Sequence, residues 1–232
     1  MAEVVRINQD TWRVEDGNVR FYLLCGKERA ALVDSGRDTP DARQIAEGLT
    51  DLPLLLINTH ADMDHISGNG AFDEFYMSPA EEENYRSRGG SGTILPVREG
   101  DRIDLGGRVL RVIDQPGHTP GSIALLDERD RVLISGDSVQ NGRIFLFGRF
   151  RNVPLYIESL KHVLEYAGEF DEIYAMHGSV PVGPELIPKL IEGAGRILRG
   201  EAEGERVNEF GNEVMLYRFP FAEFLCELTL GK

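Results

Sequence analysis

The sequence has few cysteines and no long apolar segment, and both shortages restrict what the protein can be. Cys25 and Cys226 could form at most one disulfide, so a disulfide-stabilised scaffold is excluded and two unpaired thiols are expected. The apolar run at residues 54–57 is far too short to cross a bilayer. Residues 1–12 lack the apolar core of a signal peptide. Together these shortages favour a cytoplasmic protein without a membrane-spanning segment.

Basic residues are also scarce relative to acidic ones. The chain has 25 Lys and Arg against 39 Asp and Glu, which gives a net charge of −14. A field of that sign opposes binding to nucleic acid and to anionic membranes, and no run of Lys and Arg marks a local basic groove. The 232 residues are enough to bury a core without disulfides or a structural metal. We therefore expect a globular protein that binds a small molecule; no feature indicates its oligomeric state.

Strand-like and helix-like segments follow one another in two similar halves. Expected strands cover residues 4–8, 11–14, 19–25, 30–33 and 54–58 in the first half, and 101–105, 108–114, 122–127, 131–135, 172–176, 214–219 and 221–228 in the second. Expected helices cover residues 39–49, 79–87, 154–166 and 184–198. No linker of disordered composition separates the halves, so the pattern predicts a single domain over residues 1–232 made of two α/β layers.

Four of the five histidines lie in short motifs where expected strands end. The run from His60 to His65 offers four potential ligands in six residues, and His118, Asp137 and His177 lie beside glycines in later motifs. Loops at the ends of several strands can meet at one edge of a sheet, so we expect these side chains to converge. Imidazole and carboxylate groups are ligands of zinc, iron and manganese. The pattern therefore predicts a metal site.

In their order and rough spacing, the motifs resemble those of the metallo-β-lactamase superfamily. The matching segments are Leu32-Val33-Asp34-Ser35-Gly36, Asn58-Thr59-His60-Ala61-Asp62-Met63-Asp64-His65, Gly117-His118-Thr119-Pro120-Gly121-Ser122, Ser135-Gly136-Asp137 and His177-Gly178. The resemblance implies an α/β fold, an αβ/βα sandwich in which two mixed β-sheets pack face to face with helices outside. It also implies a metal-dependent hydrolase.

Carried over by position, the resemblance implies two divalent metal ions. The implied ligands are His60, Asp62 and His118 for the first ion, Asp64, His65 and His177 for the second, and Asp137 as a bridge. The resemblance places Asp34 near the site as a supporting acid rather than a ligand. Zinc is the metal that the family favours.

Position 62 departs from the usual pattern of the family, which has histidine there. Either Asp62 is a ligand in a carboxylate-rich site, or it is not a ligand and the first site is weak or empty. In the first case the additional negative charge should raise the pKa of the bound water above the ~7 of histidine-rich zinc sites. An oxygen ligand at position 62 would also favour manganese or iron more than the usual histidine does. The substitution Asp62→His is then expected to raise zinc affinity.

The implied reaction is attack by a metal-bridging hydroxide on an ester, lactone, thioester, amide or phosphodiester, with Asp64 orienting the water or moving a proton. A second hypothesis is a diiron redox protein related to flavodiiron proteins, which carry a carboxylate at the position of Asp62. That protein would need a separate electron donor, because the chain has no room for a flavodoxin-like domain. A non-catalytic metal-binding protein and a nuclease are the remaining alternatives. The complete ligand set disfavours the former, and the negative charge the latter.

The candidate substrate-binding region is the stretch from Arg143 to Arg151, which mixes apolar and cationic side chains. It could be a pocket wall in which Arg143 or Arg149 recognises an anionic group, or a buried loop whose arginines are solvated. Tyr156, near the start of an expected helix, is a weaker candidate.

Overall fold

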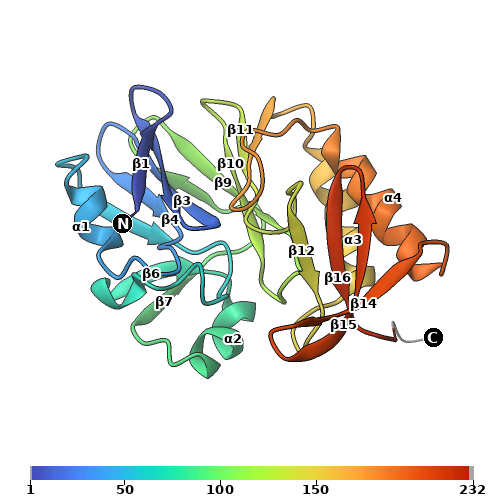
Figure 1. Cartoon of the computed structure of the whole chain (residues 1–232). Coiled ribbons are helices and arrows are strands. Elements are labelled where there is room, and N and C mark those ends of the chain that lie inside the picture. Colours follow the sequence, from blue (N-terminus) through green and yellow to red (C-terminus); the bar gives the residue numbers. More distant parts are fainter. Residues whose placement is uncertain (1, 230–232) are drawn as a thin grey trace.

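The strands of the first half pair in chain order into a seven-stranded sheet, which forms one side of the computed structural model of residues 2–229 (Figure 1). These strands are β1 (Glu3–Arg6), β2 (Thr11–Asp16), β3 (Val19–Cys25), β4 (Ala30–Val33), β5 (Leu54–Ile57), β6 (Glu74–Met77) and β7 (Thr93–Pro96). Strands β1 to β4 are antiparallel, whereas β4 to β7 are parallel. Helices α1 (Ala42–Glu47) and α2 (Glu82–Ser87) and the short 3₁₀ helices η1 (Asn69–Ala71) and η2 (Pro79–Glu81) connect the parallel strands.

The second half supplies a five-stranded mixed sheet with the order β13-β11-β10-β9-β8. Its strands are β8 (Arg102–Asp104), β9 (Val109–Asp114), β10 (Ile123–Asp127), β11 (Val132–Ile134) and β13 (Glu172–Tyr174). Helices α3 (Val153–Glu165) and α4 (Leu186–Leu198) belong to the same half. Helix α3 begins where the sequence favours a start, because the Asn152 side chain accepts a hydrogen bond from the Leu155 N–H and Pro154 lies in the first turn.

A four-stranded sheet near the C-terminus was not expected. It has the order β12-β16-β15-β14 and contains β12 (Arg143–Leu146), β14 (Gly204–Glu209), β15 (Asn212–Phe219) and β16 (Ala222–Cys226). Strands β12 and β16 are parallel, and the other pairs are antiparallel. The sheet lies beside α3 and α4 in Figure 1. Only its last two strands were predicted, because β12 is short and β14 is largely exposed and polar.

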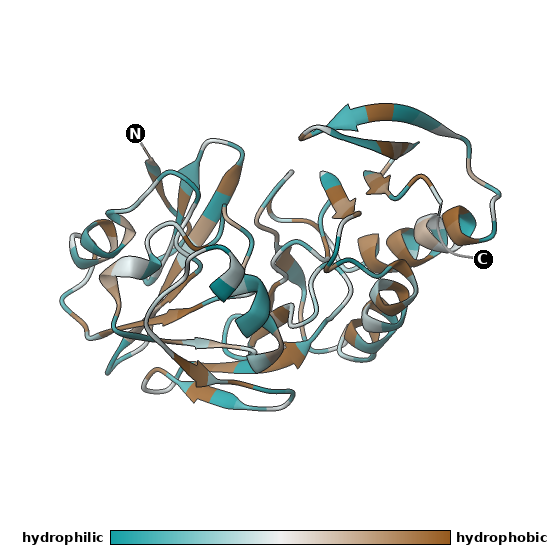
Figure 2. Cartoon of the chain, turned by 90° about the horizontal axis from the view of Figure 1, so that it is seen from below, coloured by the Kyte–Doolittle hydropathy of each residue, from teal (hydrophilic) through white to brown (hydrophobic). Residues whose placement is uncertain are grey.

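Alternating side chains of the central strands fill the cores between these layers. Tyr22 and Leu24 of β3 face the second sheet, whereas Phe21 and Leu23 of the same strand pack against the side that α1 covers. A further core joins the outer face of the second sheet to α3, α4 and the C-terminal sheet. Figure 2 shows the corresponding hydrophobic stripes on the helices. The predicted αβ/βα sandwich is confirmed, with the C-terminal sheet as an addition to it.

Two further expectations concern the cysteines and the membrane. Cys25 and Cys226 are both free, as the sequence predicts, and the structure shows that both are buried. Among residues 2–229, no helix combines the length and the apolar character needed to cross a bilayer.

Candidate metal centre

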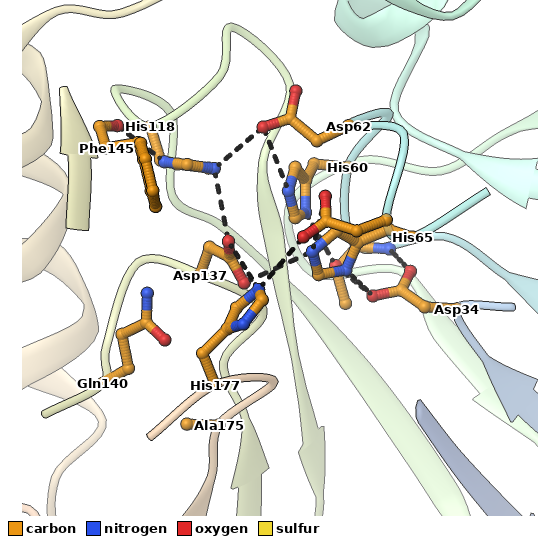
Figure 3. Close-up of polar contacts among 12 residues, drawn as sticks. Asp34, His60, Asp62, His65, His118, Asp137, Gln140, Phe145, Ala175 and His177 are labelled. Atoms are coloured by element: carbon orange, nitrogen blue, oxygen red, sulfur yellow. Dashed lines mark hydrogen bonds and ion pairs between the residues drawn. The ribbon is translucent and has the colours of Figure 1, made fainter. Parts of the chain in front are cut away.

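The histidine and aspartate motifs lie in loops that meet at one edge of the sandwich (Figure 3). The loop after β5 carries His60 to His65, the loop after β11 carries Asp137, and the loop after β13 carries His177. His118 lies in the loop between β9 and β10. Side chains that are far apart in the sequence are therefore close together here, as the motif positions predicted.

Seven side chains form two groups around one aspartate. The ligand atoms of His60, Asp62 and His118 lie within 4.8 Å of one another, and so do those of Asp64, His65 and His177. Asp137 lies between the groups. Its Oδ2 is 3.7 Å from His118 Nε2 and 3.4 Å from His177 Nε2. Its Oδ1 is 3.5 Å from His65 Nε2. These separations are long for hydrogen bonds, and they suit ligands that each lie ~2 Å from a shared ion.

The central nitrogens and oxygens of the cluster lack partners among the protein atoms. Within residues 2–229, the buried Nε2 atoms of His60, His65 and His118 and the buried Oδ1 of Asp137 have no hydrogen-bond partner. A buried polar atom without a partner is costly, so a native structure rarely leaves several of them around one point. Imidazole nitrogens and carboxylate oxygens are the donor set of divalent zinc, iron and manganese. The residues present therefore fit a metal centre.

Main-chain carbonyl groups orient two of the histidines. His118 Nδ1 lies 2.9 Å from the Phe145 carbonyl oxygen, and His177 Nδ1 lies 2.6 Å from that of Asn18. A carbonyl oxygen can only accept, so each Nδ1 donates, and in the neutral ring Nε2 is then the nitrogen that carries the lone pair. Both rings therefore direct Nε2 to the centre, and Nε2 can bind a metal once the ring is neutral.

Asp34 orients the other two histidines from behind. Its Oδ2 lies 2.8 Å from His65 Nδ1 and also accepts a hydrogen bond of 2.7 Å from the Thr59 hydroxyl. Because that hydroxyl donates to Asp34, it can accept from His60 Nδ1, which is 3.0 Å away. Asp34 is fully buried and has a φ of 63°, an uncommon conformation for an aspartate. The structure thus places Asp34 behind the ring of His65, the position that the resemblance implied.

Two arginines contact Asp62, and neither contact was predicted from the sequence. Asp62 Oδ1 accepts a hydrogen bond of 2.8 Å from Arg88, and Oδ2 accepts one from Arg151. The same Oδ2 lies 3.4 Å from His118 Nε2 and 3.8 Å from His60 Nε2. The arginines therefore offset the negative charge that aspartate adds at this position. The expectation of a more anionic site is wrong for the protein as a whole, because it counted only the implied ligands.

The aspartates of the cluster are held in their ionised forms. Burial opposes ionisation of Asp64, but the charges of His65 and His177 hold its pKa at about 2. Burial likewise opposes ionisation of Asp137, yet the same two histidines lower its pKa well below the usual range. Burial lowers the pKa of His177, but Asp137 and Asp64 raise it to about 10. A cation that binds to this cluster would therefore displace protons from histidine.

A buried glutamate links two of the loops that carry the clustered residues. Glu81 is fully buried, and its Oε2 accepts hydrogen bonds from the Ala61 N–H at 2.9 Å and the Asn84 amide at 3.0 Å. Its Oε1 accepts from the Gly121 N–H at 2.7 Å. Ala61 precedes Asp62, and Gly121 lies just beyond the histidine of its own loop. The only sequence signal was the position of Glu81 in an expected helix.

A cavity of about 600 Å³ opens above the cluster. Asp62, Asp64, Asp137 and His177 line it together with Arg88, Arg151 and three phenylalanines. That volume is typical of a small-molecule site. The cavity is consequently the place where a substrate could reach the clustered residues.

The three substrate-binding candidates predicted from the sequence do not line this cavity. Arg143 pairs with Glu223 at 3.0 Å, and exposed Arg149 pairs with Glu83. Each arginine therefore already has a carboxylate partner at the surface. From the same stretch, Phe145, Phe147 and Arg151 face the cavity instead.

Tyr156 is a core residue rather than a substrate-binding one. Its side chain is fully buried, and its hydroxyl donates a hydrogen bond of 2.8 Å to the Ser138 carbonyl, next to Asp137. Its main chain packs against Gly117, where an added Cβ would lie 2.3 Å from the Tyr156 nitrogen. Gly117 also has a φ of 132°, so glycine is required for this approach. Tyr156 therefore supports the loops of Asp137 and His118 from behind.

Comparison with known proteins identifies the family of the chain. The model of the metallo-beta-lactamase superfamily matches residues 14–172, which include every clustered residue except His177. The chain belongs to the metallo-β-lactamase superfamily. A metallo-β-lactamase from Pontibacter korlensis is similar in fold, with a TM-score of 0.71 at 15% sequence identity over 83% of this chain and 99% of that structure.

Two curated relatives of this superfamily member are named as hydrolases. An acyl-coenzyme A thioesterase, MBLAC2, of Gallus gallus is 31% identical over 190 residues, which cover 65% of this chain and 69% of the relative. A hydroxyacylglutathione hydrolase of Gloeobacter violaceus is 32% identical over 149 residues, which cover 57% and 59%. The chain is a hydrolase of the metallo-β-lactamase superfamily.

Proposed function

We propose that the chain hydrolyses thioesters of small molecules, with two divalent metal ions held by its clustered histidines and aspartates. The proposed ligands are His60, Asp62 and His118 for one ion, Asp64, His65 and His177 for the other, and Asp137 for both. The observation that carries the proposal is the set of buried, unpartnered atoms around one point, namely the Nε2 atoms of His60, His65 and His118 and the Oδ1 atom of Asp137, an aspartate that also lines the cavity. The names of the two curated relatives support the thioester class.

Zinc is the metal that we propose. Divalent zinc at such a site supplies Lewis acidity and lowers the pKa of water. Because Arg88 and Arg151 share the Asp62 carboxylate, that group is a weaker anionic donor than a free aspartate. The four oriented histidines then dominate the donor set, which suits zinc better than manganese or iron. The hydrolase names of the relatives also favour hydrolysis over the diiron redox alternative.

The leaving group provides a chemical argument for thioesters. The low pKa values of Asp62, Asp64 and Asp137 mean that none of these groups carries a proton near neutral pH. An alkoxide or amine must be protonated as it leaves, whereas a thiol has a pKa near ~8.5 and can leave as the thiolate. Thioesters are therefore favoured, because the thiolate can leave unprotonated, whereas the leaving group of an ester or amide would need the proton that Asp64 takes from water.

The residues around the cavity have separate tasks in this proposal. Asp64 Oδ2 lies 3.3 Å from His177 Nε2 at the cavity floor, and as an ionised carboxylate it can accept a proton from the attacking water. Arg88 and Arg151 place positive charge beside the cavity, where negative charge develops on the carbonyl oxygen during attack. The two free thiols agree with the cytoplasmic location that we propose.

The test combines metal analysis with a matched pair of substrates. We expect two zinc ions per chain in protein purified without added metal or chelator, and faster hydrolysis of a thioester than of the oxygen ester with the same acyl group. Asp137→Asn should lose both metal and activity. Asp51→Asn is the control, since Asp51 is exposed and does not line the cavity. Full activity of Asp137→Asn, or a preference for the oxygen ester, would contradict the proposal.

A further inference from the structure

The cavity has one aromatic wall, which the C-terminal sheet provides. Phe145 lies in β12 and Phe147 directly follows it, while the alternating residues Ile144 and Leu146 point into the core. Both phenylalanines are half-buried and pack on apolar side chains of the C-terminal sheet. Phe210 completes the wall, with its ring stacked 5.9 Å from that of Phe145. Three rings thus line the same side of the cavity.

Phe210 occupies a position that is unfavourable for the free protein. It lies at the tip of the β14–β15 hairpin, in a two-residue turn between the paired residues Glu209 and Asn212. Phe210 has a φ of 50° and Gly211 a φ of 81°, a combination that favours Asn-Gly and disfavours a bulky residue. The side chain is also 80% exposed, so burial does not offset the backbone strain. Strain of this kind occurs often at functional sites.

The hairpin brings this residue to the cavity from a distant part of the sequence. In Figure 2 the hairpin stands away from the helices and its tip turns back towards the middle of the molecule. Arg143 of β12 pairs with Glu209 at 3.3 Å, which ties the hairpin to the strand that carries Phe145. The family model ends at residue 172, so the hairpin lies outside the matched region.

A second wall of the cavity, beside His177, is polar, and Met63 is the one other apolar residue that residues 2–229 contribute to the lining. Asn18, Arg37 and Asp38 line it from the first half of the chain, and Arg37 donates a hydrogen bond of 2.6 Å to Asn18. The aspartates and His177 form the floor between the two walls. A molecule bound across the floor would therefore have one apolar end and one polar end.

We propose that the aromatic wall of Phe145, Phe147 and Phe210 binds the acyl group of the substrate, and that this acyl group is an apolar chain. This inference rests on the proposed function and specifies its substrate class. The polar end then carries the thiol part of the molecule, in keeping with the polar wall. Phe210 is a specificity-determining residue, which becomes covered when a chain of several carbons occupies the cavity.

The main test compares two thioesters of N-acetylcysteamine, with acetyl and octanoyl groups. The wild type should favour the octanoyl compound in kcat/KM. Phe210→Ala should reduce that preference roughly fivefold to tenfold, the effect of uncovering ~50 Å² of apolar surface. Phe210→Asn should reduce it equally while unfolding no more easily than the wild type, because asparagine tolerates a positive φ. Phe221→Ala is the control, since Phe221 lies at another turn of the same sheet and outside the cavity.

Two further measurements separate this inference from the proposed function. Binding of S-octyl-N-acetylcysteamine, a thioether that cannot be hydrolysed, should weaken in Phe210→Asn by a similar factor. Such weakening would support the aromatic wall even if no thioester is hydrolysed. The acetyl thioester of octanethiol, which carries its chain on the thiol side, should be insensitive to Phe210→Asn. Equal sensitivity of this compound, or an unchanged octanoyl preference in both Phe210 variants, would overturn the assignment of the acyl group to this wall.

Discussion

Glu81 connects stability with metal binding, and the substitution Glu81→Gln tests that connection. Glutamine keeps the shape of the side chain but replaces one acceptor oxygen with a donor. The carboxylate accepts from Ala61 and Gly121 on different oxygens, so one of these buried N–H groups would face the new amide. Losing a hydrogen bond to a charged group and leaving a buried donor unpaired should together cost about 2–4 kcal/mol of unfolding free energy.

The expected change is large enough to measure by thermal unfolding. For a chain of this size, 2–4 kcal/mol lowers Tm by roughly 4–16 °C. Metal affinity should fall as well, because Ala61 lies between His60 and Asp62 and any shift of its main chain displaces both side chains. Glu82→Gln is the control, since Glu82 is the adjacent residue and is exposed.

Two results would refute this reasoning about Glu81. The first is a Glu81→Gln protein whose unfolding free energy differs from that of Glu82→Gln by less than ~0.5 kcal/mol. The second is a zinc titration that gives the same affinity for both variants. Either result would mean that the hydrogen bonds to the two loops contribute little to the position of the ligands.

Three other perturbations have expected outcomes. Asp62→His should lower zinc affinity by roughly 10- to 100-fold in a competitive chelator titration, because Arg151 loses its anionic partner beside the site. This is the opposite of the sequence-based expectation, and a higher affinity would contradict it. Arg108→Met should reduce the unfolding free energy in urea by about 3–5 kcal/mol, because buried Asp127 loses a partner at 2.6 Å; a loss below ~1 kcal/mol would contradict this. Burial raises the pKa of Cys226 to about 12, so at pH 8 its thiol should react with a disulfide reagent only after denaturation, and rapid labelling of the folded protein would disprove it.

Local sequence patterns predicted the central elements of the fold well. The segments 19–25 and 30–33 form β3 and β4 with the predicted bounds, since each is a run of apolar and β-branched residues. Strand β14 escaped prediction because most of its residues are polar and exposed, and its place in a sheet depends on pairing with β15. The sequence patterns therefore missed β12 and β14 of the C-terminal sheet, and also the short strands β6 and β7 of the first sheet.

Some residues of the candidate site could be predicted from the sequence, and others could not. The clustered histidines and aspartates were found because they lie in short motifs at strand ends. The partners of Asp62 could not be found in this manner, because Arg88 and Arg151 lie 26 and 89 residues away from it in the sequence. Phe210 could not be predicted as a cavity residue either, because it reaches the cavity only through the pairing of β14 with β15. A sequence motif contains only residues that are close in the chain, so contacts that form only in the tertiary structure cannot be predicted from it.

The hydrogen bond between His177 and the Asn18 carbonyl joins residues 159 positions apart and has a consequence for how the protein matures. Tyr22 and Arg20 reinforce the same junction by donating to the Ala175 carbonyl at 2.8 and 3.1 Å. Contacts of such long sequence separation form late, because the intervening chain must first be ordered. His177 is thus fixed only after both halves have docked. Ions that need this residue would arrive at a nearly finished fold, and they would slow its unfolding rather than speed its formation.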